Sequence, residues 1–380
     1  MLQKILLLSI CLFSIAILPA QQIENITISS EVLGQDREII VFTPAAYDEL
    51  IYSYYDVIYV FDAQNRGFFD YVHALAPFIT EGQQPFIVVG IKAFYQEGVD
   101  YGRNNDFLPE LSTTRSVQRY GPYSGNIDNF LSYVQTEVIP YVDQHYRTLP
   151  VRTGIGHSLG GSFVLYALTH AQGIFNNYVA VSPNLAYEDQ LLANELINFD
   201  YDRLNGPAFI YLSSADEGNY WSYWQPARER VHSFYRTNFD YPQHQLVVEE
   251  HPEKTHLSNY PPSVEAALKA YLSNTYGLQQ QILSEDQQEV IVRVTAAATT
   301  EELYITGNQE ALGNWDPGKI RMQKVEDSVW EIQLSLRSPA TFKFTGGSWE
   351  TEAQIQDSYG TNLTIIPEEG GVYEFRVLPE

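Results

Sequence analysis

The chain has 380 residues, of which 44% are hydrophobic and 18% charged; this composition excludes wholesale disorder and predicts about two domains with sizeable cores. The formal net charge is −25, and no block of Lys and Arg interrupts it. Such a charge repels polyanions, so nucleic acid and anionic membrane surfaces are excluded as partners. The 28 Tyr, 19 Phe and 5 Trp residues suit cores and also neutral ligands such as sugars.

The first twenty residues have the pattern of an export signal. Lys4 supplies the positive start, residues 5–18 form an apolar run too short to span a bilayer, and Ala20 offers a small-residue cleavage point. The only cysteine, Cys11, lies inside this run, so the mature chain is left without a thiol for disulfides, metal sites or catalysis. We therefore predict a signal peptide over residues 1–20 and a secreted or periplasmic protein with no membrane span.

Residues 21–276 alternate between short apolar strands and amphipathic helices. Continuous apolar runs predict strands buried on both faces at residues 57–61, 86–91, 178–181, 208–212 and 245–249. Apolar residues spaced three and four apart predict helices over residues 127–145 and 261–272. This alternation predicts an α/β domain built on a doubly wound, mainly parallel sheet.

The rest of the chain has a different texture. Residues 277–288 are polar and Gln-rich, which is typical of a linker. Residues 289–380 contain short alternating strands separated by Gly, Asn, Asp and Pro, without a convincing helix. The predicted strands lie at residues 290–294, 303–305, 329–336, 341–344 and 372–377. This pattern predicts a small all-β, immunoglobulin-like sandwich.

The strongest local signal is the segment GIGHSLGGS at residues 154–162. It contains Gly156-x-Ser158-x-Gly160, placed after a short strand and before a helix. A serine on such a sharp turn has a strained backbone, and flanking side chains would collide there. The turn exposes the serine hydroxyl and directs the Leu159 N–H, at the helix N-terminus, toward a developing oxyanion. The motif predicts that Ser158 is a nucleophile.

A nucleophilic serine needs a histidine base and an acid that orients it, and in this fold class they follow in the order serine, acid, histidine. The predicted strand at residues 208–212 leads to Asp216, the preferred acid, with Glu217 as the alternative. The next strand leads to His256, the preferred base, with His251 as its competitor. His157, next to the serine, is expected to point away and pack.

Other chemistry has no signature in the sequence. No HExxH zinc motif, GxGxxG dinucleotide fingerprint or P-loop occurs, so neither a metal nor another cofactor is expected. The loops at residues 93–119 and 219–226 are rich in Tyr and Trp, and we expect them to wall the substrate pocket.

Four segments in order carry a resemblance to a known family: YDVIYVFDAQ (55–64), RNNDFLP (103–109), residues 125–147, and the Ser158 turn. Together they resemble the Putative esterase family of α/β-hydrolases, which includes esterase D, ferric-enterobactin-type esterases and feruloyl or acetylxylan esterases. The resemblance implies an ester hydrolase and a second oxyanion N–H from Ala63 or Gln64. The family usually has Asp-Gly-Gln where this chain has Asp62-Ala63-Gln64.

The C-terminal segment resembles a family 20 starch-binding carbohydrate-binding module. The resemblance rests on residues 303–308 (LYITGN), 311–317 (ALGNWDP), 328–331, 342–344 and 347–350. It implies a glucan platform made by Trp315 and Trp349, with Lys343 and Asn362 bonding to sugar hydroxyls. Flat aromatic faces match the apolar faces of pyranose rings. Trp330, which alternates with polar neighbours on a strand, is expected in the core.

The sequence is compatible with three functions. The first is an exported serine esterase whose substrate is an acylated carbohydrate, with the C-terminal domain binding an α-glucan-like polysaccharide. The second is a glycan-binding surface protein with an inert hydrolase domain, supported by the Ala63 departure. The third is a siderophore or small-ester hydrolase whose β domain is structural.

Overall fold

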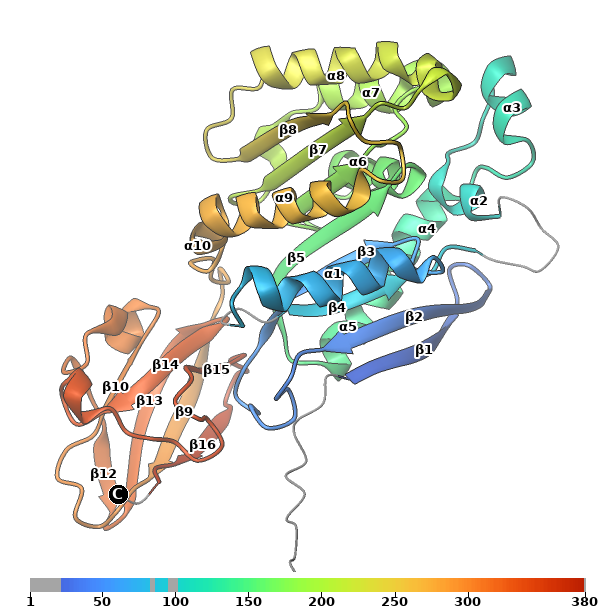
Figure 1. Ribbon diagram of the computed structural model, residues 1–380. Helices are drawn as coiled ribbons and strands as arrows, with labels where there is room; N and C mark the ends of the chain where they lie inside the picture. Colours follow the sequence, from blue (N-terminus) through green and yellow to red (C-terminus); the bar gives the residue numbers. More distant parts are fainter. Residues whose placement is uncertain (1–21, 83–85, 95–101, 379–380) are drawn as a thin grey trace, which may run out of the picture.

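The computed structural model describes residues 22–82, 86–94 and 102–378, without the side chains of residues 219–221. The predicted export signal lies outside this part of the chain. Two units are visible: a large α/β unit and a smaller all-β unit at the C-terminal end (Figure 1). Within the described residues, no helix is both long and apolar enough to cross a membrane.

The α/β unit is built on one eight-stranded sheet with the order β1-β2-β4-β3-β5-β6-β7-β8. Strands β3 to β8 are mutually parallel, whereas β1 and β2 form an antiparallel edge that was not predicted. The strands are β1 (Gln22–Ser30), β2 (Gln35–Thr43), β3 (Tyr55–Phe61), β4 (Phe86–Ile91), β5 (Thr148–His157), β6 (Asn177–Val181), β7 (Phe209–Ala215) and β8 (Gln245–His251).

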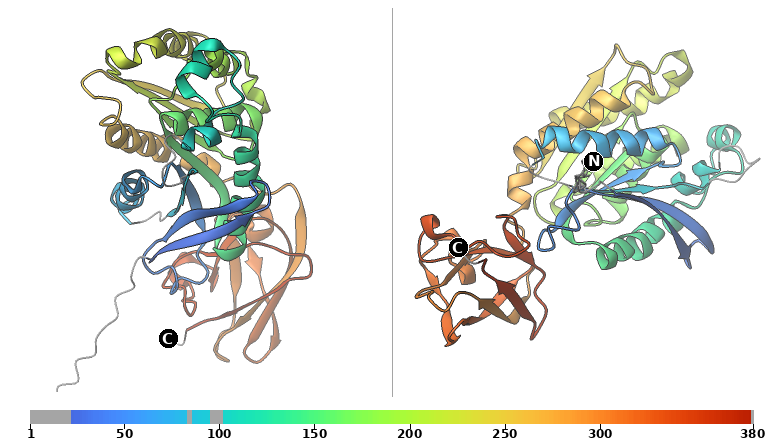
Figure 2. Two further views of the ribbon diagram at one scale, coloured as in Figure 1. Left: turned by 90° about the vertical axis from the view of Figure 1, so that its right-hand side faces the viewer. Right: turned by 60° about the horizontal axis from the view of Figure 1, so that its bottom comes forward.

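Helices cover both faces of this sheet, as the apolar runs in β3, β4, β6 and β7 require. Helices α1 and α9 pack on one face, and α4 to α8 pack on the other (Figure 2). The helices are α1 (Arg66–Ile79), α2 (Arg103–Phe107), α3 (Thr114–Tyr120), α4 (Ile127–Tyr133), α5 (Ile139–His145), α6 (Leu159–His170), α7 (Tyr187–Asn198), α8 (Gln225–Thr237), α9 (Tyr260–Asn274) and α10 (Tyr276–Gln279). Shorter 3₁₀ segments are η2 (Tyr201–Arg203) and η3 (Asn219–Trp224). The predicted doubly wound architecture is confirmed.

The helix predicted over residues 127–145 is interrupted by a π-helical turn, η1 (Val134–Val138), between α4 and α5. Pro140, in the first turn of α5, has no N–H to donate to the preceding turn. The Thr136 hydroxyl, within the wide turn, donates to the Ser132 carbonyl at 2.8 Å. The wider turn keeps Val134 and Val138 buried on the same face.

The C-terminal unit is a sandwich of two four-stranded sheets, ordered β11-β10-β14-β15 and β12-β13-β9-β16. Its strands are β9 (Gln287–Thr295), β10 (Tyr304–Gly307), β11 (Ile320–Arg321), β12 (Gln323–Glu326), β13 (Val329–Arg337), β14 (Ala340–Thr345), β15 (Leu363–Ile365) and β16 (Val372–Arg376). Short 3₁₀ turns are η4 (Glu310–Trp315) and η5 (Trp349–Thr351). Trp330 is 2% exposed, in the core as predicted.

The predicted linker is firmly packed where it leaves the α/β unit. Gln279, only 1% exposed, donates from Nε2 to the Asn177 side chain and to the Pro207 carbonyl, both at 2.8 Å. Gln280 donates to the buried Asp56 carboxylate at 2.9 Å. These partners stand at the beginnings of β6, β7 and β3, so the glutamines tie the second unit to the amino-terminal edge of the sheet.

We predict that Gln279→Leu lowers the free energy of unfolding by about 2 kcal/mol, because buried amide and carbonyl groups lose their partners. Urea unfolding followed by fluorescence measures the change. The control is Gln281→Leu, two residues along on an exposed position, which should shift stability by no more than about 0.5 kcal/mol. Equal effects of the two variants would contradict the role given to Gln279.

Candidate active site

Ser158 stands on the predicted strand–turn–helix, between β5 and α6. Its backbone has φ +58° and ψ −123°, a conformation that L-residues rarely adopt. A Cβ on Gly156 would lie 2.2 Å from the Gly160 carbonyl oxygen, so only glycine fits there. The Ser158 N–H donates to the Val181 carbonyl at 2.9 Å, which fixes the turn against the end of β6.

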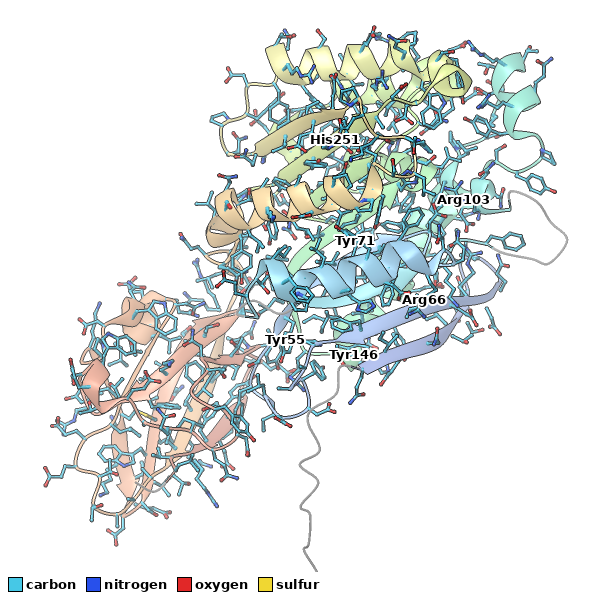
Figure 3. All side chains as sticks on the ribbon, viewed as in Figure 1. Tyr55, Arg66, Tyr71, Arg103, Tyr146 and His251 are labelled. Atoms are coloured by element: carbon cyan, nitrogen blue, oxygen red, sulfur yellow. The ribbon has the colours of Figure 1, made fainter. Side chains whose placement is uncertain are left out.

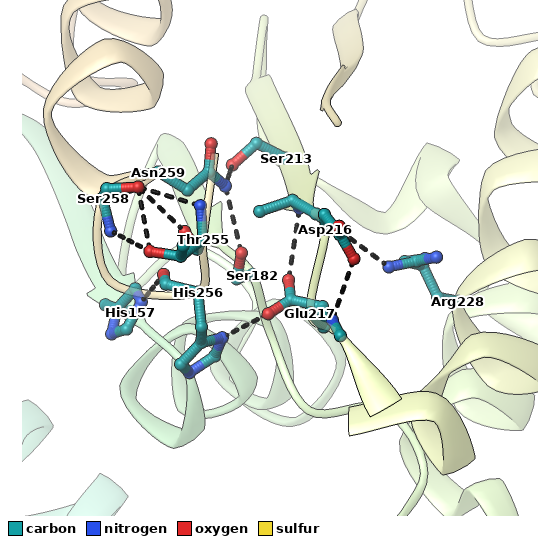
Figure 4. Close-up of polar contacts among 12 residues, drawn as sticks. His157, Ser182, Ser213, Asp216, Glu217, Arg228, Thr255, His256, Ser258 and Asn259 are labelled. Carbon is teal, nitrogen blue, oxygen red and sulfur yellow. Dashed lines mark hydrogen bonds and ion pairs between the residues drawn. The ribbon is translucent and has the colours of Figure 1, made fainter. Parts of the chain in front are cut away.

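His256 is paired with Glu217. Its Nδ1–H donates to Glu217 Oε2 at 2.6 Å, and the two side chains are 17% and 6% exposed (Figure 4). With Nδ1 protonated, a neutral imidazole carries its lone pair on Nε2, as a general base for serine requires. Burial raises the pKa of Glu217, but hydrogen bonds from His256, Ser182 and the Ala215 N–H outweigh it, so the pKa lies below its usual value. The carboxylate is therefore ionised and able to orient the histidine.

The structure contradicts the expected contact between Asp216 and His256, and the alternative carboxylate, Glu217, makes that contact. Asp216 is exposed, and its carboxylate accepts from the Gly218 N–H at 2.9 Å instead of from His256. Successive residues at the end of an extended strand point to opposite sides, so only one of two neighbouring carboxylates can face the site. His251, the competing base, is not hydrogen-bonded to Glu217; its Nε2 lies 3.4 Å from Glu249 Oε2.

A buried polar network supports Glu217 from behind, and the sequence did not reveal it. Asn259, fully buried at the start of α9, donates from Nδ2 to Ser182 Oγ at 3.0 Å and to Ser213 Oγ at 3.3 Å. Ser182 follows β6 with φ +43° and in turn bonds to Glu217. One feature of the sequence could have pointed to Ser182: like Ser158, it directly follows a buried parallel strand.

His157 does more than pack. Its ring is buried against Phe68 and Tyr260, and its Nε2–H donates to the His256 carbonyl oxygen at 2.7 Å. The rings of His157 and His256 have centroids 4.6 Å apart. Burial and the neighbouring His256 lower the pKa of His157 to about 4. A neutral His157 thus fixes the backbone of the base to the turn that carries Ser158.

The predicted second oxyanion donor is narrowed to one residue. The Ala63 N–H donates to the Ile91 carbonyl at 3.1 Å, so Ala63 is engaged in the sheet and was the wrong candidate. Gln64 remains a candidate through its backbone N–H, while its side chain is fixed by Ala93 N and Asp62. The Leu159 N–H stands at the first position of α6, where a helix supplies no internal acceptor.

An ion pair next to the Ser158 turn was missed by the sequence reasoning. Asp62, 2% exposed, accepts from Arg103 Nε at 2.8 Å and from Nη2 at 2.6 Å. A Cβ on Gly160 would lie 3.2 Å from Asp62 Oδ2, so the pair lies against the first turn of α6. Burial opposes the charge on Arg103, but Asp62 outweighs this and raises the pKa of the guanidinium. The site therefore holds a fixed, partly exposed cation.

Aromatic and cationic side chains line the approach to the site. Trp224 packs edge-on against the His256 ring with centroids 5.4 Å apart. Tyr223 bonds through its hydroxyl to Tyr120 of α3, at 3.0 Å, and the Arg119 guanidinium lies 4.1 Å from the Tyr223 ring centre. A groove of about 910 Å³ next to Gln64 is lined by cations, among them Arg66 and Lys92, and by the carboxylates of Asp36 and Glu38. Arg66 and Arg103 are labelled in Figure 3.

In the C-terminal unit, the two predicted platform tryptophans lie on neighbouring loops. Trp349 is 43% exposed and Trp315 is half-buried. A Cβ on Gly318 would lie 2.9 Å from the Gly347 carbonyl, which shows how closely the two loops approach. Lys343 is held by Glu352 and the Gly360 carbonyl, at 2.5 and 3.1 Å, and Asn362 is exposed.

Comparison with known proteins decides the family. Residues 30–231, more than half of the chain, match the family described as Putative esterase. The chain belongs to this esterase family. Residues 287–356 match the family described as Starch binding domain. Both expected resemblances are confirmed, and the chain is an esterase-family hydrolase with a C-terminal starch-binding-type domain.

One curated relative and two solved structures illustrate what this esterase-family chain is similar to. Ferri-bacillibactin esterase BesA of Bacillus subtilis (strain 168) is 28% identical over 123 residues, which are 31% of this chain and 43% of the relative. The chain thus matches less than half the length of that curated relative. An IroE-like serine hydrolase from Shewanella oneidensis has a TM-score of 0.56 at 19% identity, covering 69% of this chain and 82% of that one. Siderophore hydrolase EstA from Aspergillus nidulans has a TM-score of 0.55 at 20% identity, covering 68% and 96%.

We predict that Glu217→Gln lowers kcat by about 10²- to 10⁴-fold, because an amide cannot stabilise the imidazolium that forms on His256. Hydrolysis of nitrophenyl acetate measures the change. The matched control is Asp216→Asn on the neighbouring residue, which should stay within about twofold of wild type. Comparable losses in both variants would contradict the assignment.

Acid stability tests the buried state of His157. A histidine whose pKa is lowered on folding binds more protons when unfolded, so stability falls as the pH drops from the unfolded value of about 6.5 toward 4. Replacing it with Gln, which can also donate a hydrogen bond, removes this titration. We expect the loss in unfolding free energy between pH 7.5 and pH 5 to be about 2 kcal/mol smaller in His157→Gln than in wild type. Identical losses in urea titrations would show that His157 is not held neutral.

Proposed function

We propose that this protein hydrolyses carboxylic esters with Ser158 as nucleophile, His256 as general base and Glu217 as the orienting acid. The observation that carries the proposal is the His256–Glu217 hydrogen bond of 2.6 Å, fixed by His157 to the strained turn that presents Ser158. His157 ends β5 and Ser158 follows it, whereas Glu217 and His256 come after β7 and β8. These strands are parallel, so their carboxyl ends lie at the same edge of the sheet.

The proposed reaction has two halves. Ser158 Oγ attacks the ester carbonyl while His256 Nε2 takes its proton, and Glu217 stabilises the resulting imidazolium. His256 then gives the proton to the leaving alcohol, and the acyl group stays on Ser158. Water, activated by the same histidine, attacks the acyl-enzyme and releases the carboxylic acid.

Two kinds of donor are available for the oxyanion. The Leu159 N–H lies at the N-terminus of α6, where the helix dipole also favours negative charge. The Ala63 N–H is already bonded to the Ile91 carbonyl and cannot serve. The Arg103 guanidinium, which Asp62 holds against the same turn, supplies a positive charge instead. We assign Arg103, with the Gln64 N–H, as the second donor.

The substrate remains within two classes. The starch-binding-type domain favours an acylated carbohydrate as the substrate. The signal-like first twenty residues, which predict export, fit an extracellular polysaccharide of this kind. A second candidate is a siderophore-type or other small ester, in line with the name of BesA, a ferri-bacillibactin esterase. The observation that favours it is the partly exposed guanidinium of Arg103 against the Ser158 turn, which offers a positive charge to an anionic group of the substrate. The ordered His256–Glu217 pair argues against a catalytically inert domain.

The test is hydrolysis of nitrophenyl acetate, nitrophenyl butyrate, methyl ferulate and acetylated xylan by four proteins. Ser158→Ala should lose at least about 10³-fold in kcat while keeping the wild-type circular dichroism spectrum. Arg103→Gln should lose about 10²- to 10³-fold, as expected for one oxyanion donor. Ser233→Ala, an exposed serine on α8, serves as the control and should match wild type. Retained activity in Ser158→Ala would overturn the assignment of the nucleophile.

A further inference from the structure

The catalytic residues and the starch-binding-type domain stand at opposite edges of the sheet. Ser158 and Glu217 follow the carboxyl ends of β5 and β7. The segment that leads to the C-terminal unit, in contrast, lies at the amino ends: Gln279 bonds to Asn177, the first residue of β6, and Gln280 bonds to Asp56, the second residue of β3. Figure 3 shows Arg103 at the edge of the sheet far from the β sandwich and Tyr55 at the edge near it.

Strand length sets the separation. β5 runs from Thr148 to His157, ten residues, and therefore spans about 33 Å at the usual rise of an extended chain. Tyr146, two residues before it, is labelled on the side near the sandwich in Figure 3. Ser158 comes directly after its other end. The whole length of β5 thus lies between the catalytic turn and the junction with the second unit.

Within the sandwich, the Trp349 loop lies at the end of β14 away from the connecting segment, and the Trp315 loop comes close to it at Gly318. The end of β14 at Ala340 lies near the α/β unit. Just before it, the Ser338 carbonyl accepts a hydrogen bond from the Ser284 N–H of the connecting segment. Just after it, Thr341 pairs with Thr364, whose N–H donates to the Tyr52 carbonyl of the α/β unit. The far end of β14 is Thr345, whose hydroxyl donates to the Pro317 carbonyl at 2.6 Å. The Trp349 loop begins at this far end. The Trp315 loop starts at the near end, where the Asn308 N–H donates to the Thr341 carbonyl, and reaches the far end at Pro317 and Gly318.

The two units are held in this arrangement by direct contacts. The Thr364 N–H donates to the Tyr52 carbonyl at 3.0 Å, and the Tyr52 ring packs on Phe375 with centroids 5.1 Å apart. Gln279 and Gln280 fix the connecting segment to the sheet, and the Tyr52 contacts fix the sandwich itself to the α/β unit. The platform is therefore not carried on a free tether that could swing to Ser158.

We infer that the glucan bound by Trp315 and Trp349 is not the molecule whose ester is cleaved at Ser158. This inference rests on the proposed function, both the esterase and the glucan platform. The domain anchors the enzyme to an α-glucan surface, and the active site, facing away from that surface, takes a separate ester from the surrounding solution. A short acylated glucan seated on the platform cannot reach Ser158, because more than the length of β5 separates them.

The test compares wild type with the double variant Trp315→Ala/Trp349→Ala in the full chain, with Phe78→Ala, an 81% exposed aromatic on α1, as control. Three quantities are measured: retention on insoluble starch, kcat/KM for nitrophenyl acetate, and kcat/KM for acetylated maltotriose. We expect the double variant to lose at least about tenfold in starch retention. We expect kcat/KM for both soluble esters to stay within about twofold of wild type. Wild-type turnover of nitrophenyl acetate without turnover of acetylated maltotriose would also support the inference.

Other outcomes overturn it in distinguishable ways. A KM for acetylated maltotriose that rises about tenfold in the double variant, with nitrophenyl acetate unchanged, would show that the platform presents the reacting sugar. Starch retention that is absent in wild type, or unchanged in the double variant, would refute the platform and the inference together. Nitrophenyl acetate hydrolysis then reports separately on whether the esterase proposal survives.

Discussion

The close approach of β5 and α6 at Gly156 and Gly160 is the constraint on which the site depends. Backbone atoms of Gly160 occupy the place where a Cβ on Gly156 would stand. The chain therefore reverses over one residue, Ser158, whose positive φ this reversal requires. The same crossing places the N-terminus of α6 beside the serine and brings Asp62 against the first helical turn. Backbone strain at Ser158 is tolerated because buried strands on both sides of β5 hold the turn.

Around that turn, polar side chains at successive strand ends form one connected network. Asn259 bonds to Ser182 and Ser213, Ser182 bonds to Glu217, and Glu217 bonds to His256. Buried polar groups of this kind are stabilising only when each has a partner, and together they restrict the orientation of the base. His157 closes the network from the other side through the His256 carbonyl. The histidine is therefore fixed by its side chain and by its backbone.

The parallel sheet, the turn at Ser158 and the loops that carry the acid and base could be predicted from the sequence, because apolar runs and glycine spacing report directly on buried strands and close backbone approach. The choice between Asp216 and Glu217 could not, because which of two adjacent carboxylates faces inward depends on where β7 ends. Ala63 was a wrong candidate for a related reason: its N–H is consumed by the neighbouring β4, a pairing that appears only with the sheet order. Arg103 and Asp62 are 41 residues apart, and no local pattern reveals that they meet.

The connecting segment shows the same limit at the level of domains, with a consequence for function. Its glutamines suggested a solvated linker, yet Gln279 and Gln280 satisfy buried polar groups at the amino ends of β6, β7 and β3. A polar sequence is equally suited to water and to a buried hydrogen-bonding surface, so composition alone does not distinguish them. Once the glutamines are bound at that edge, the sandwich must stand opposite the carboxyl ends of the strands, where the catalytic residues of this fold gather. The separation of the Trp349 loop from Ser158 thus follows from the partners that these two amide side chains find and from the contacts of Tyr52 with the sandwich.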